Sequence, residues 1–114
     1  MNLLVFITSK VETIDPILAE LLERNLCGAS VVDCAGMLKS LNESSVDAPP
    51  IFGSLRKFIN PDHESNKMLL IVLSEEDTKT VRSIIKKHMN SLNQPNTGIL
   101  FEVPICNVEG ASIR

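Results

Sequence analysis

Residues 67–92 read KMLLIVLSEEDTKTVRSIIKKHMNSL and join a strand pattern directly to a helix pattern. The six apolar residues of 68–73 form a run that is too short for a buried helix, so the run predicts a strand covered on both faces. Ser74 is a favourable N-cap, Asp77 follows three residues later, and the acidic residues between them suit the positive end of a helix dipole. We therefore predict a helix that begins directly after the strand.

Apolar residues recur at helical spacing after Ser74 and form one stripe, while the basic residues between them face water. The stripe consists of Val81, Ile84, Ile85, Met89 and Leu92. A similar unit opens the chain, because residues 2–9, NLLVFITS, match 67–74 in residue type at most positions. Two successive β-α-β units are typical of the split βαβ, ferredoxin-like arrangement.

The first of these units carries its own helix signals. Asp15 followed by Pro16 predicts a helix with the proline in its first position, and Gly28 lies just past the expected end. The expected buried stripe of this helix is Ile17, Leu18, Leu21 and Leu22.

Residues 29–35 and 98–105 predict the second and the last strand, and Pro104 favours a sheet edge or a bulge for the latter. The fold class is therefore α+β, with the order βαββαβ, an antiparallel four-stranded sheet and two helices on one face. The other face has no cover within the chain, although it presents either Leu4 and Phe6 or the alternate apolar residues of the first strand. The simplest remedy is a homo-oligomer that packs these faces together.

A long connection, residues 37–66, joins the second and third strands, where a hairpin needs only a few residues. Within it, residues 50–59, PIFGSLRKFI, carry apolar side chains at helical spacing after a proline and predict a short amphipathic helix. This helix either packs on its own sheet edge or docks on a neighbouring subunit or an outside partner. An excess of this size usually indicates a functional loop.

Composition excludes several classes of function. The chain has 114 residues, a net charge of −3 and no aromatic residues besides four Phe, which argues for a single domain and against a nucleic-acid-binding surface. The apolar run at residues 3–7 is too short for a membrane span or a signal peptide, so we expect a cytoplasmic protein. Cys27, Cys34 and Cys106 lack CxxC spacing and fit reduced thiols, and we expect Cys106 to be buried and inert.

No residue combination indicates catalysis, and we expect no enzyme. Asp62, His63 and Glu64 could bind a metal ion, but adjacent residues of one loop need a remote ligand to complete a site. His88 lies near the end of the second helix, where a packing role is expected.

The segments GASVVDCAGM (28–37) and TGILFEVPICNVEGA (97–111), with the long loop between the second and third strands, resemble the PII-like (nitrogen regulatory) signal-transduction proteins. The resemblance covers 1–114 as a single PII-like domain. It implies a homotrimer that binds an adenine nucleotide or another small effector between subunits. It also implies that the 37–66 loop engages a target protein such as a transporter or an enzyme.

Carried over residue by residue, the resemblance assigns ligand binding to Ser30, Gly36, Met37, Thr97 and Gly98. Several departures concern phosphate binding. Gly98 stands where nucleotide-binding members have a lysine, Pro95 removes one backbone donor, Glu109 adds repulsion, and only Arg114 offers a cation in the tail. AMP, ADP or a non-nucleotide effector is therefore favoured over ATP. The alternatives are a purely structural trimeric module of this fold and a divalent-metal-binding relative that depends on His63.

Overall fold

The computed structural model describes residues 1–37, 65–89 and 97–110, and the structural statements below concern these residues. The elements in chain order are β1 (Asn2–Thr8), the 3-10 helix η1 (Val11–Thr13), α1 (Ile14–Glu23), β2 (Ser30–Ala35), β3 (Ser65–Leu73), α4 (Glu75–His88) and β4 (Gly98–Pro104).

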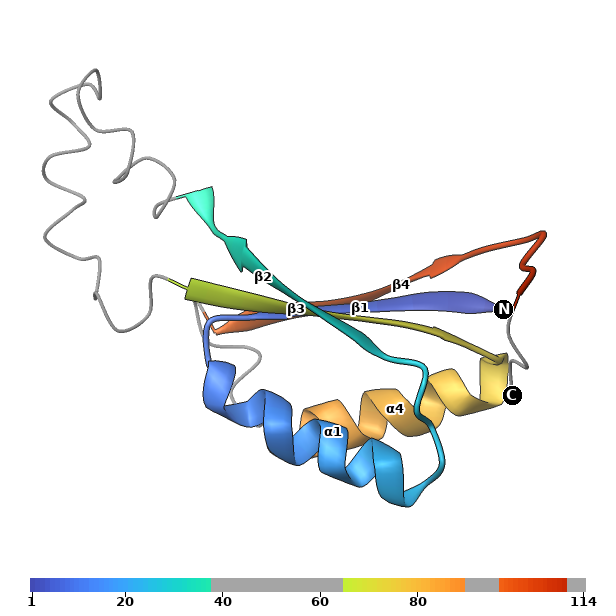
Figure 1. The fold of residues 1–114 in the computed structure, drawn as a ribbon, viewed down its shortest axis with the longest axis horizontal. Coiled ribbons are helices and arrows are strands. Elements are labelled where there is room, and N and C mark those ends of the chain that lie inside the picture. The colour runs from blue at the N-terminus through green and yellow to red at the C-terminus, as the bar shows by residue number, and fades with distance from the viewer. Residues whose placement is uncertain (38–64, 90–96, 111–114) are drawn as a thin grey trace, which may run out of the picture.

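All neighbouring strands are antiparallel, in the order β2-β3-β1-β4. Both helices lie on the same face of the sheet, as Figure 1 shows. This is the ferredoxin-like α+β arrangement that the sequence predicts. Pro104 ends β4, which is an edge strand, so its missing N–H falls where the sequence places it.

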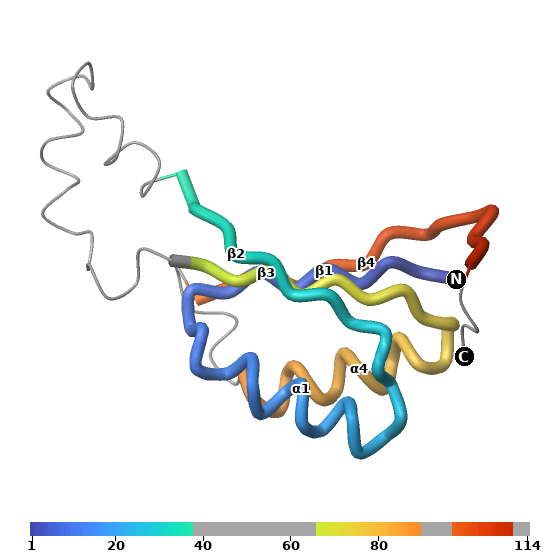
Figure 2. The backbone as a smooth tube through the Cα atoms, viewed as in Figure 1, coloured from blue at the N-terminus to red at the C-terminus, as the bar shows by residue number. Residues whose placement is uncertain are grey.

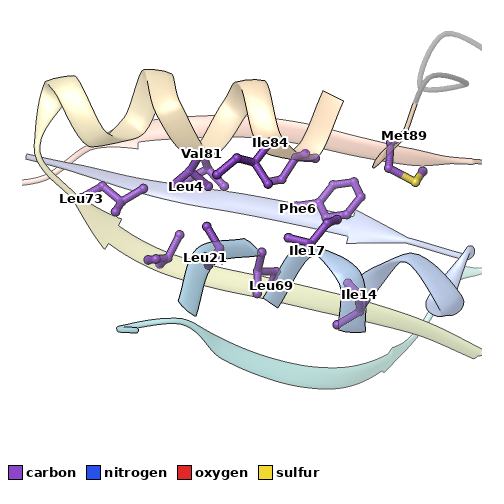
Figure 3. Packing of buried hydrophobic residues seen from close by; sticks show 12 residues of the cluster. Leu4, Phe6, Ile14, Ile17, Leu21, Leu69, Leu73, Val81, Ile84 and Met89 are labelled. Atoms are coloured by element: carbon purple, nitrogen blue, oxygen red, sulfur yellow. The ribbon is translucent and has the colours of Figure 1, made fainter. Parts of the chain in front are cut away.

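The α4 helix begins as expected, because the Ser74 side chain accepts a hydrogen bond from Asp77 N at 3.2 Å. Val81, Ile84, Ile85 and Met89 are buried, while Leu92 lies outside the described residues. The stripe packs on the helix-facing side chains of the sheet, Leu4 and Phe6 of β1 among them, and Figure 3 shows these side chains between sheet and helices.

The α1 helix begins at Ile14, so Pro16 is its third residue and not its first. The proline still lies in the first turn, where backbone N–H groups have no partner within the helix. Ile14, Ile17 and Leu21 are buried, but Leu22 is 68% exposed and its predicted burial is wrong. Each residue rotates roughly 100° around a helix axis, which carries Leu22 away from the line through Ile14, Ile17 and Leu21.

The end of α1 also differs from expectation, because Asn25 and not Gly28 reverses the chain. Asn25 has a φ of 61°, its N–H donates to Leu22 O at 3.0 Å, and Leu26 N donates to Leu21 O at 2.9 Å. These two bonds form a Schellman motif, which brings Leu26 onto the core.

The return strand β3 starts at Ser65, three residues before the predicted run 68–73, because Cys34 pairs with Asn66 and Ala35 with Ser65. The connection therefore leaves β2 after Ala35 and returns at Ser65. Its predicted helix at 50–59 lies outside the described residues.

Candidate functional site

The sheet face opposite the helices, here called the open face, carries apolar side chains in register on three adjacent strands. Its central row places Val5 of β1 between Leu70 of β3 and Phe101 of β4. The flanking rows are Leu3 with Val72 and Val103, and Ile7 with Met68 and Ile99. On β2, Val32 continues the last of these rows. Of the two sets that the sequence offered for this face, the structure selects Leu3, Val5 and Ile7.

Several of these side chains remain in contact with solvent. Ile99 is 55% exposed, Phe101 39%, Val103 41% and Val32 42%, whereas Leu4 and Phe6 on the helix-facing side are 0% exposed. A contiguous apolar surface of this kind is typical of a protein-protein contact. The open face is thus the strongest candidate interface of the described part of the chain.

The five predicted ligand-binding residues lie at opposite edges of the sheet. Ser30 begins β2, and Gly36 and Met37 follow its end; Thr97 and Gly98 lie at the start of β4. Because β3 and β1 separate the two edge strands, one chain does not bring the two groups together. Figure 2 shows β2 and β4 on the two sides of the central pair.

Gly36 does not have a positive φ, since Gly110 is the one described glycine that does. A Cβ at Gly36 would approach Asn66 Nδ2 at 3.2 Å, and that atom is the far end of a flexible side chain. The adjacent Met37 is 73% exposed. Side chains can therefore be introduced at Gly36 with little disturbance of the backbone.

Thr97 and Gly98 are held tightly against β1. Thr97 is 6% exposed, and its carbonyl accepts hydrogen bonds from Ser9 N at 3.3 Å and from Thr8 Oγ1 at 2.8 Å. A Cβ at Gly98 would lie 2.8 Å from Ile7 O, so the close approach of β4 to β1 requires glycine there. A lone threonine at a strand end gives no signal in the sequence, so the contacts of Thr8 emerge only from the structure.

A cross-strand ion pair lies near the end of β2, where the chain leaves the sheet for the connection 37–66. Lys67 Nζ donates to Asp33 Oδ1 at 2.8 Å, and this hydrogen bond is the main reason that the pKa of Lys67 is raised. Asp33, Lys67, Thr8 and Gly98 are successive partners across the sheet. This row therefore carries three polar side chains, those of Asp33, Lys67 and Thr8, and ends at the first residue of β4.

Glu20 joins the two helices on their outer surface. Its carboxylate contacts Lys87 Nζ, His88 Nε2 at 3.1 Å and Arg24 at 3.7 Å, and the hydrogen bond from Lys87 is the largest cause of its lowered pKa. Glu20, Arg24 and Lys87 border an open groove of about 310 Å³ that is also lined by Thr80, Ser83 and Ile84. His88 thus lies within hydrogen-bond distance of the Glu20 carboxylate, a contact between the two helices.

Metal and thiol chemistry gain little support from the described residues. Within 1–37, 65–89 and 97–110, no three His, Cys, Asp or Glu side chains gather as metal ligands, and the Asp62–His63–Glu64 candidate lies outside these ranges. All three cysteines are free. Cys106 is exposed, which contradicts its predicted burial. The helices of the described ranges include none that could span a membrane.

Comparison with known proteins adds no assignment, since neither a scan of protein-family models nor a search of curated proteins gave a match. The functional interpretation therefore depends on the geometry above and on the resemblance carried by residues 28–37 and 97–111.

Proposed function

We propose that the chain is a PII-like regulatory protein, a cytoplasmic homotrimer that binds a small effector between subunits and controls a target protein through its 37–66 loop. The observation that carries the proposal is the open face, because its three rows of apolar side chains need a partner surface. A second copy of the same chain offers a surface with matching chemistry. Burial of this face in the trimer leaves both helices on the outside.

A closed ring of copies also explains how the candidate ligand residues can meet. Heterologous contacts place one edge of a subunit beside the other edge of the next. In such a ring, Ser30, Gly36 and Met37 of β2 approach Thr97 and Gly98 of a neighbouring β4. The effector site is then a cleft between subunits that no single chain contains.

The sequence of the cleft favours a ligand with little phosphate charge. Gly98 supplies no side-chain cation, and Pro95 supplies no backbone N–H. AMP and ADP are therefore better candidates than ATP, and a non-nucleotide effector fits the same chemistry.

Thermal-shift measurements with AMP, ADP, ATP, cyclic dinucleotides, bicarbonate and divalent metals test this proposal, because a ligand that binds the folded state raises the melting temperature. We expect AMP or ADP to raise it and Gly36→Val to abolish that rise. Light scattering should give a trimer mass for both proteins, since the space at Gly36 admits a Cβ.

Several outcomes would overturn the proposal. A monomer mass for the parent protein would remove the interface, and a Gly36→Val variant that binds as well as the parent would remove the cleft. Metal-dependent stabilisation that disappears in His63→Ala would instead identify a metal-binding relative.

A structural trimeric module is the second candidate, and the turn before β4 favours it. Gly98 has a packing reason in its approach to Ile7 O, and Thr97 is buried, so neither residue needs a ligand to explain it. A trimer that no compound of the panel stabilises would identify this module.

A further inference from the structure

The Thr8 hydroxyl connects two segments that are far apart in sequence. It donates to Thr97 O at 2.8 Å and accepts from Lys10 N at 2.9 Å, and Thr8 is only 1% exposed. The first bond holds the turn that enters β4, and the second holds the chain as it leaves β1 for η1. One buried side chain therefore fixes the relative position of both segments.

Packing alone does not require a hydroxyl at this position. The preceding helix-facing residues of β1 are Leu4 and Phe6, both fully buried and apolar. A valine has nearly the shape of threonine and would fill the same space. What threonine adds is one donor and one acceptor, and a buried hydroxyl is tolerated here because both are used.

The Thr97 carbonyl accepts hydrogen bonds from the Thr8 hydroxyl and from the backbone of Ser9. Gly98 has no side chain, and the backbone bond from Ser9 N to Thr97 O is longer, at 3.3 Å. β4 lies so close to β1 at Gly98 that a Cβ there would be 2.8 Å from Ile7 O. The Thr8 hydroxyl is therefore well placed to set the position of Thr97 and Gly98.

We propose that Thr8 is a positioning residue for the effector cleft, which orders the Thr97–Gly98 turn without touching the ligand. This inference rests on the proposed function, since it concerns the same cleft. Its chemical content is specific: the hydroxyl, and not the methyl group or the volume of the side chain, carries the effect.

Two variants separate the hydroxyl from the packing. Thr8→Val keeps the shape and removes both hydrogen bonds, while Thr8→Ser keeps the hydroxyl and removes the methyl group. Amide hydrogen exchange at Lys10 should accelerate about fivefold or more in Thr8→Val, as expected for the loss of one hydrogen bond, and should stay near the parent rate in Thr8→Ser. The melting-temperature rise with ADP should be lost in Thr8→Val and kept in Thr8→Ser, with the same light-scattering mass for all three proteins.

The outcomes distinguish this inference from the proposed function. If ADP and AMP fail to stabilise the parent, the nucleotide site and the role of Thr8 in it both fall. If the parent binds and Thr8→Val binds equally well, only the role of Thr8 is overturned. Equal loss of binding in Thr8→Ser and Thr8→Val would assign the effect to packing and would also contradict the inference.

Discussion

The two faces of the sheet are built from similar residues but have opposite surroundings. On the helix-facing side, Leu4 and Phe6 are fully buried by α1 and α4. On the open face, Phe101 and Ile99 remain 39% and 55% exposed although their strand partners are equally apolar. The two faces therefore do not differ in residue type. They differ because α1 and α4 lie on one of them.

In the proposed trimer, this difference separates folding from assembly. The covered face supplies the core of the single chain, because the helices bury it without help from another molecule. The open face adds little to that core, and its apolar area gains most when a second copy covers it. A mutation on one face should therefore act on chain stability, and a mutation on the other should act on assembly.

The largest difference is expected when a phenylalanine on each of the two faces is replaced by alanine. Phe6→Ala removes a fully buried ring from the core and should cost about 3–5 kcal/mol of unfolding free energy at any protein concentration. Phe101→Ala removes a half-exposed ring, so it should leave the chain folded and reduce the mass from trimer to monomer. Urea unfolding at several protein concentrations, with light scattering, measures both effects.

Leu22→Ala is the matched control for the open face. Leu22 is 68% exposed and lies on α1, away from the sheet, so its removal should change neither mass nor stability by much. If Phe101→Ala keeps the parent mass, the open face is not the interface. A loss of folding in Phe101→Ala as severe as that in Phe6→Ala would show that the two faces do not differ as described.

Most of the fold could be predicted from local patterns. Residues 68–73 and the Ser74 cap indicated β3 and α4 because both signals are contained in adjacent residues. The errors on α1 have a different cause. Leu22 and Leu21 are the same residue type, and only the exact rotation of the helix decides which of them faces the core.

The candidate site was less accessible to sequence reasoning than the fold. The sequence pattern correctly indicated that Gly36 and Gly98 lie at strand ends. It could not show that a side chain at Gly98 would collide with Ile7 O, whereas one at Gly36 would meet only the flexible end of Asn66. The roles of Thr8 and Glu20 arise from contacts with residues far along the chain, Thr97 and Lys87. No local window of sequence contains such information.

A smaller effect on stability is expected from substitutions just after the C-terminal end of α1. Asn25 adopts a left-handed conformation, which costs less for Asn than for Ala, so Asn25→Ala should destabilise the chain by about 1 kcal/mol. Gly28 has no positive φ, and a Cβ there meets nothing within 4 Å, so Gly28→Ala should be neutral or slightly stabilising. Thermal unfolding compares the two variants, and a larger loss in Gly28→Ala would assign the helix stop to the glycine after all.

The smallest effect concerns the ionic link between the two helices that cover the sheet. Lys87 and His88 lower the pKa of Glu20, so the carboxylate is favoured in the folded chain over the unfolded one. A lowered carboxyl pKa gives stability that is present above the ordinary value of 4.5 and is lost as pH falls through the folded pKa. Glu20→Gln should therefore lower the melting temperature slightly at pH 7 and leave it unchanged in strong acid.

Glu23→Gln on the same helix provides the control for this pH dependence, because Glu23 is exposed. Melting curves from pH 3 to pH 7 should show a smaller rise with pH for Glu20→Gln than for the parent, and a parent-like rise for Glu23→Gln. The effect stays small because Lys87 and Arg24 are well exposed to solvent, with side-chain exposures of 60% and 53%, and solvent screens their attraction to the carboxylate. If Glu20→Gln and the parent rise in parallel, the ionic link does not stabilise the covered face, and apolar packing between α1 and α4 alone holds the helices together.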